Sequence, residues 1–130
     1  MSNKSKGCNA ERELIHLFWA NDWAAVRIAG SGSSQYPSPD VLASNAKRKI
    51  AIEAKLTKDK NKYFPKEEIH ALKLFSEKFG AEAWIGIKFI RDRWYFLKVD
   101  DLDLTSQNFV ISIQLAKEKG ITFNKLIGVL

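Results

Sequence analysis

Two carboxylates and one ammonium group are spaced along this sequence as they would be in a metal-dependent catalytic site. Residues 50–56 alternate with a period of two, as in a strand, which places Glu53 and Lys55 on the same face. Pro39 can begin a strand but cannot continue one in mid-sheet, so we predict that a short strand starts at Asp40. If the two strands pair antiparallel, Asp40 lies roughly opposite Glu53. Directly opposed like charges destabilise a sheet, so a divalent cation would be needed to neutralise them.

The same three side chains predict chemistry on a phosphate group. Hard cations such as Mg²⁺ take oxygen ligands, use one or two carboxylates and keep water and substrate phosphate in the other positions. Lys55 would then direct its charge at the phosphate or at the attacking water. The alternative is an exposed ion pair of Glu53 and Lys55 on an amphipathic hairpin, with Asp40 as a turn residue. The residues alone leave both interpretations open.

Length and charge limit the class of protein. The chain has 130 residues, enough for one hydrophobic core, so we expect a single domain over residues 1–130. Apolar residues make up 45% of the chain, which favours a folded globule over disorder. Lys and Arg number 21 against 15 Asp and Glu, and the resulting net charge of +6 favours a polyanionic partner.

Cysteine use and hydropathy exclude other classes. Cys8 is the only cysteine, which excludes an internal disulfide framework and a zinc site built from cysteines. One unpaired thiol suits a reducing compartment, so we expect a cytoplasmic protein. No segment approaches the roughly 18 apolar residues of a membrane helix, so we expect no membrane partner.

An acidic residue lies at the end of the apolar stripe of the first predicted helix, residues 10–20. Asn9 can cap this helix, and Glu11 shares a face with Leu14 and Phe18. Glu11 could belong to a site, or it could be a first-turn acid that complements the helix dipole.

A basic strand and a polar loop come next. Residues 23–29 form a predicted strand in which Arg27 faces away from Val26 and Ile28. Residues 30–39 are rich in Gly and Ser and suit a mobile loop beside a site, or a plain linker.

Residues 58–66 interleave four lysines with two aromatic residues. Lysines can contact phosphate groups and aromatic side chains can stack on bases, so we predict that Lys60 and Lys62 bind DNA. The alternative is that the segment is an ordinary solvated loop. A helix should follow over residues 65–79, ended by Gly80.

Two strong strands, residues 83–89 and 94–99, complete a predicted mixed sheet. The signal is weaker after residue 100, where we expect a strand at 109–113, a helical turn at 113–119 and a short helix at 122–127. The pattern predicts an α/β fold with a central mixed sheet flanked by helices.

Five motifs make the chain resemble the archaeal-type Holliday junction resolvases (Hjc), which are restriction-endonuclease-like nucleases with a Pro-Asp…Glu-x-Lys signature. The resemblance covers residues 7–99, and nothing is carried over beyond them. The motifs are Ala-Glu-Arg-Glu-Leu at 10–14, Val-Arg-Ile-Ala-Gly-Ser-Gly at 26–32, Pro-Asp-Val-Leu-Ala at 39–43, Ile-Glu-Ala-Lys at 52–55 and Phe-Ser-Glu-Lys-Phe-Gly at 75–80.

The resemblance implies roles for individual residues. The implied metal ligands are Glu11, Asp40, Glu53 and the carbonyl of Ala54. Lys55 would stabilise the charged transition state, and Ser31 matches a catalytic loop serine that lies at the DNA. Arg12 and Arg27 match basic residues that act on DNA. A dimer interface is expected on one helix, with Leu72, Leu74, Phe75 and Phe79.

The expected function is therefore a Mg²⁺-dependent endonuclease, with Mn²⁺ as a substitute. It would resolve four-way DNA junctions by paired cuts during recombination and repair. We expect a homodimer, with other recombination or replication proteins as candidate partners. One alternative is a related nuclease of the same fold that cuts other DNA structures. Another is a non-catalytic basic DNA-binding module, against which the intact set of Glu11, Asp40, Glu53 and Lys55 argues.

Overall fold

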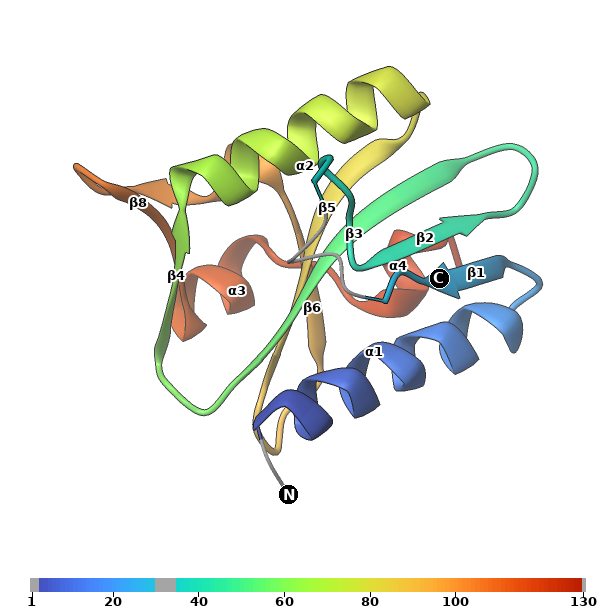
Figure 1. Ribbon diagram of the computed structural model, residues 1–130. Coiled ribbons are helices and arrows are strands. Elements are labelled where there is room, and N and C mark those ends of the chain that lie inside the picture. Colours follow the sequence, from blue (N-terminus) through green and yellow to red (C-terminus); the bar gives the residue numbers. More distant parts are fainter. Residues whose placement is uncertain (1–2, 30–34, 130) are drawn as a thin grey trace.

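A five-stranded mixed sheet forms the centre of the fold (Figure 1). The structure is a computed structural model, and it describes residues 3–29 and 35–129. The strands lie in the order β1-β2-β3-β5-β6, with β3 and β5 parallel and the other pairs antiparallel. Their bounds are β1 Ala24–Arg27, β2 Val41–Ser44, β3 Lys49–Thr57, β5 Glu82–Phe89 and β6 Trp94–Lys98. The predicted fold class is confirmed.

Helices cover both faces of this sheet (Figure 1). On one face, α1 (Asn3–Trp19) and α4 (Phe123–Leu126) pack against a buried cluster that includes Phe18, Ile52 and Phe96. On the other, α2 (Lys66–Phe79) and α3 (Ile113–Lys119) pack against a second cluster that includes Ile69 and Ile85. Successive side chains of β3 and β5 point to opposite faces of the sheet, so these strands contribute residues to both clusters.

A small second sheet lies beside α2 in the order β4-β8-β7. Its strands are β4 Asn61–Pro65, β7 Asp103–Leu104 and β8 Asn108–Ser112, and a short 3₁₀ helix, η2 (Val99–Asp101), precedes β7. The sequence pattern predicts no strand where β4 lies. Asn, Lys and Pro have low strand propensity, and the pairing of β4 with the distant β8 outweighs it. The weaker prediction of a strand near residues 109–113 is confirmed, with its start at Asn108.

Of the two long helices, α1 differs from prediction at its N-terminal end and α2 agrees with it. The described part of α1 already begins at Asn3, so the predicted cap at Asn9 is wrong and Glu11 lies in the interior of the helix. Packing of the apolar stripe on the sheet outweighs the low helix propensity of Gly7 and Asn9. For α2, the prediction holds: the helix follows Pro65 and ends at Gly80, whose φ of 79° is left-handed.

Among the described residues, none of the helices has both the length and the apolar composition needed to span a membrane.

Candidate active site

Asp40 lies at the point where three strands meet. The β2–β3 ladder ends at the pair of Val41 with Ile52, so Asp40 lies just before the last pair on one strand and Glu53 just after it on the other. The backbone N–H of Asp40 donates to Ile52 at 3.0 Å, and its carbonyl accepts from Ile28 at 2.8 Å. The charge of Asp40 acts on Glu53 and both residues line one hollow, so the two carboxylates lie close together, as predicted. They lie just beyond the last pair of the ladder and are not themselves a pair in it, because β2 begins at Val41.

The side chain of Asp40 accepts a hydrogen bond from a backbone N–H of β3 that has no partner on β2. Its Oδ2 accepts a hydrogen bond from the Ala54 N–H at 2.9 Å, beyond the end of the β2 ladder. Because the N–H and C=O of one strand residue point to the same side, the Ala54 carbonyl also faces Asp40. This orientation is the one that the expected role of the carbonyl as a ligand requires.

Glu53 and Lys55 project from β3 towards α2. Alternation along β3 places them on the same face as Ala51, which belongs to the cluster beneath α2. The Nζ atom of Lys55 lies 3.7 Å from Glu53 and 2.8 Å from Glu68, a residue in the first turn of α2. Asp40 and Glu53 are each only 9% exposed. The alternative of an exposed hairpin ion pair is therefore wrong.

An open hollow of about 590 Å³ contains this group. Its floor holds Asp40, Glu53 and Lys55, and one wall is the first half of α2 with Glu68. The rest of its lining comes from the second half of the predicted loop, where Tyr36 is 73% exposed. Buried carboxylates at the base of an open, polar hollow are the arrangement expected of a catalytic centre.

The carboxylates alter one another's ionisation. Burial, a hydrogen bond with Glu68 and the charge of Asp40 raise the pKa of Glu53 far above its usual range. Burial also opposes ionisation of Glu68, but its contacts with Glu53 and Lys55 outweigh burial and lower its pKa. These opposite shifts describe one proton shared by the pair, because two adjacent buried carboxylates cannot both ionise readily.

Glu11 borders this group and is held by Arg27. The Nε of Arg27 lies 2.9 Å from Glu11 Oε1, and its Nη2 donates to the Cys8 sulfur at 2.9 Å. Burial and the negative charge of Asp40 raise the pKa of Glu11, which places this carboxylate within electrostatic range of the centre. The interpretation of Glu11 as a first-turn acid fails, because α1 begins eight residues earlier.

The donor set fits a hard divalent cation. The oxygen atoms come from Asp40, Glu53, Glu11 and the Ala54 carbonyl, which are ligands of the type that Mg²⁺ prefers. Within residues 3–29 and 35–129, no three such acidic, His or Cys groups are already gathered closely enough to hold a metal. Two of these carboxylates accept hydrogen bonds instead: Glu11 from Arg27, and Asp40 from the Ala54 N–H.

Several predicted residues lie away from the hollow or outside the described chain. Ser31 and the first half of the predicted loop fall within residues 30–34, which lie outside the described residues. Arg12 is exposed and lines a separate shallow hollow on α1. Lys60 is exposed, while the charge of Lys62 lowers the pKa of Glu68, which places Lys62 near the centre.

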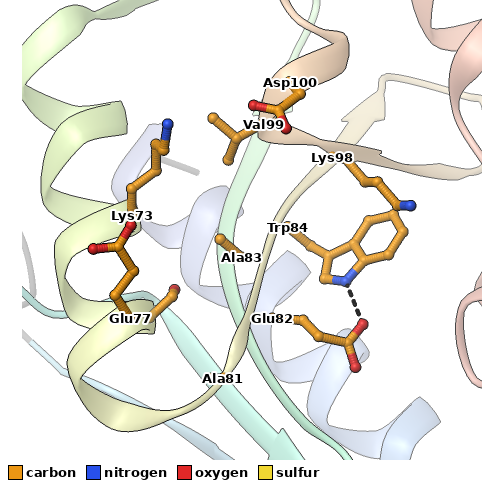
Figure 2. Close-up of a pocket in the computed structure, with 10 residues that line it drawn as sticks. Lys73, Glu77, Ala81, Glu82, Ala83, Trp84, Lys98, Val99 and Asp100 are labelled. Carbon is orange, nitrogen blue, oxygen red and sulfur yellow. Dashed lines mark hydrogen bonds between the residues drawn. The ribbon is translucent and has the colours of Figure 1, made fainter.

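A second hollow, of about 370 Å³, lies beside the C-terminal half of α2. Figure 2 shows Lys73 and Glu77 of α2 facing Trp84 and Lys98 across it. Lysines and carboxylates mix in its lining, which contains none of the predicted site residues. We therefore place the candidate centre in the hollow that contains Asp40.

Comparison with known proteins decides the family. The family model of the archaeal Holliday junction resolvases (Hjc) matches residues 2–130. The chain belongs to this family. A crossover junction endodeoxyribonuclease Hjc of Archaeoglobus fulgidus is 37% identical, over 96% of this chain and 97% of the relative. One of Sulfolobus acidocaldarius is 36% identical, over 98% of this chain and 90% of the relative.

A solved structure agrees with these relatives. The structure of Archaeoglobus fulgidus Hjc, a Holliday junction resolvase, superposes with a TM-score of 0.88 and 34% sequence identity. It covers 96% of this chain and 98% of that one. The predicted resolvase family, endonuclease class and fold are confirmed, and the nuclease family supports a need for a divalent metal. The family match also extends through residue 130, beyond the stretch on which we had based the resemblance.

Glu68 and Cys8 are two residues of this region that sequence reasoning missed. Glu68 is one of two acids in the first turn of α2, a position that the helix dipole alone explains. Only the packing of α2 over β3 shows that it meets Lys55. Cys8 was treated as a marker of the compartment, yet its sulfur contacts Arg27.

Proposed function

We propose that this resolvase-family chain is a single-domain Mg²⁺-dependent endonuclease that cuts four-way DNA junctions as a homodimer. Mn²⁺ would serve as a substitute ion. The observation that carries the proposal is that Asp40 and Glu53, both buried, lie close together beside Lys55 in an open hollow. A cytoplasmic location and contacts with other recombination or replication proteins stay predictions.

The candidate ligands and Lys55 each have a role in this proposal. Asp40 and Glu53 would hold the cation, with Glu11 and the Ala54 carbonyl as further ligands. When bound, Mg²⁺ would supply a water of lowered pKa and offset negative charge on the phosphate. The ammonium of Lys55 would stabilise the charge that develops on the phosphate oxygens.

Residues at the rim have supporting tasks. The guanidinium of Arg27 fixes the Glu11 carboxylate at the border of the hollow. A role on DNA for Arg12 and Arg27, and one in catalysis for Ser31, rest on the family resemblance and stay predictions.

A cleavage assay tests the proposal. Labelled four-way junction, duplex and flap DNA are incubated with the protein, with Mg²⁺ or with EDTA. We expect the junction to be cut and the duplex spared, and no cleavage in EDTA. Equal cutting of all three substrates would indicate a related nuclease of broader substrate range. Junction binding without cleavage would indicate a binding module.

Metal affinity should rise with pH. The raised pKa of Glu53 means that the pair with Glu68 retains a proton at neutral pH, and this proton must leave before Glu53 can act as a ligand. While the pair remains protonated, Mg²⁺ affinity should increase up to about tenfold per pH unit. Calorimetry at several pH values, in buffers of different ionisation enthalpy, measures both the affinity and the released proton. Affinity independent of pH would contradict the shared proton.

Lys60, just before β4, and Lys62 within β4 should contribute binding energy for DNA of any shape. We expect Lys60→Ala with Lys62→Ala to weaken binding to junction and duplex alike, because phosphate contacts do not depend on sequence. Each lost contact should lower the slope of log affinity against log salt by about 0.9. The charge-matched control is Lys117→Ala with Lys119→Ala on α3. An unchanged slope in the Lys60→Ala, Lys62→Ala variant would show that these lysines are ordinary solvated residues that do not contact DNA.

An apolar surface supports the proposed dimer. Val26, Leu74 and Phe79 are 57%, 45% and 49% exposed, and Phe79 lines an apolar hollow of about 290 Å³ along β1 and β2. Phe75 stacks on Phe79 with ring centroids 5.1 Å apart. Leu72, which we had included in the interface, is 3% exposed and belongs to the core. Interface centres favour such aromatic and aliphatic groups, so a second copy of the chain is the proposed occupant.

A further inference from the structure

Lys55 needs an anchor if its ammonium is to meet a phosphate at a fixed place. A lysine side chain has four rotatable bonds, and much conformational entropy is lost when one geometry is imposed on it. In the structure, two carboxylates contact Nζ: Glu53 at 3.7 Å and Glu68 at 2.8 Å. The contact with Glu68 is therefore the close one, within the range of a charge-assisted hydrogen bond.

We propose that Glu68 is a positioning residue of the nuclease, which holds the Lys55 ammonium over the reacting phosphate. This inference rests on the proposed function. In that function Glu53 is a metal ligand, so its carboxylate is committed to the cation. Glu68 comes from another element and remains to hold Lys55.

The structure makes Glu68 a rigid support. Glu68 lies in the first turn of α2. The helix begins directly after Pro65, whose ring restricts the backbone where the chain enters the helix. Its neighbour Ile69 is 0% exposed and Leu72 is 3% exposed, so the first half of the helix is anchored in the core. A site held by such an element keeps its geometry better than one held by a loop. The two partners thus lie on a central strand and on an anchored helix.

The competing explanation is a structural ion pair that only stabilises the fold. The side chains of Lys55 and Glu68 are 29% and 28% exposed, so solvent screens the pair in part. A structural role would change the melting temperature or leave all measurements unchanged. A positioning role changes the chemical step, because small displacements of a catalytic group have large effects on rate.

Single-turnover cleavage of a four-way junction at saturating protein separates these roles. We expect Glu68→Gln to slow the cleavage step by roughly 10- to 100-fold, with little change in junction affinity or melting temperature. Glu68→Asp retains the charge and should recover part of the rate. Glu77→Gln is the matched control, since it removes an exposed glutamate from the same helix in a different hollow. Equal rates for Glu68→Gln and Glu77→Gln would overturn the proposal.

The same substitution in a Lys55→Ala background shows whether Glu68 acts through Lys55. If it does, Glu68→Gln should slow Lys55→Ala protein far less than it slows the wild type. Effects that multiply in the double variant would overturn the proposal.

A measurement on metal-free protein without DNA keeps this inference separate from the proposed function. With ¹⁵N-labelled lysine, the Lys55 ammonium should give an NMR signal typical of an immobilised group in the wild type and in Glu77→Gln. In Glu68→Gln this signal should take on the properties of a mobile lysine. An unchanged signal overturns the positioning role, whereas failure of the wild type to cut junctions overturns the proposed function alone.

Discussion

Asp40→Asn should abolish junction cleavage while junction binding stays intact or becomes tighter. Asp40 is the buried acid that lies close to Glu53, and its removal as a metal ligand should lower the rate at least about 1,000-fold, or ~4 kcal/mol. Binding should survive because Lys and Arg contacts to phosphate supply most of it, and loss of a negative charge reduces repulsion of DNA. Quenched-flow cleavage and fluorescence anisotropy measure the two quantities separately.

The fold should tolerate this substitution. Asp40 also accepts the Ala54 N–H, and the amide oxygen of Asn can accept the same hydrogen bond. Circular dichroism should therefore match the wild type. Asp103→Asn on β7 removes an exposed carboxylate and should cut normally. Near-normal cleavage by Asp40→Asn would mean that the metal site is misplaced.

Phe79→Asp should dissociate the proposed dimer and remove paired cutting. Phe79 is half exposed at the end of α2 and borders the apolar hollow along β1, so a charge there would be buried without a partner in the interface. One protomer has one hollow with the catalytic groups, whereas two related by a two-fold axis can address two strands of a junction. Light scattering at micromolar concentration should report a mass near 14.8 kDa for the variant and twice that for the wild type.

The control for this prediction is Leu104→Asp, which places the same charge on β7 at a residue that is 63% exposed. This variant should remain a dimer. A Phe79→Asp protein that stays dimeric would move the interface to another surface. A wild-type monomer that still makes paired cuts would refute the dimer mechanism itself.

The proximity of the two carboxylates could be predicted from sequence because strand geometry is local. A period of two fixes the face of Glu53 and Lys55, and Pro39 marks where pairing begins. The turn between β2 and β3 then brings Asp40 close to Glu53, just beyond the observed pair of Val41 with Ile52.

Features that depend on distant packing could not be predicted in this way. Glu68 meets Lys55 only because α2 packs over β3, and no local pattern contains that information. In the same way, β4 forms through pairing with β8, although Asn, Lys and Pro, three of its five residues, have low strand propensity. Leu72 looked available for an interface, yet it fills the core beneath α2.

A supercoiled plasmid with one extruded cruciform gives the most direct test of the central claim, that this chain resolves four-way junctions with a metal held at Asp40 and Glu53. With Mg²⁺, wild-type protein should convert the plasmid to linear DNA through paired cuts at the cruciform, and Asp40→Asn should leave it supercoiled. A plasmid without the cruciform should stay intact. Linear product from Asp40→Asn, or equal cutting of the plasmid that has no cruciform, would contradict the claim.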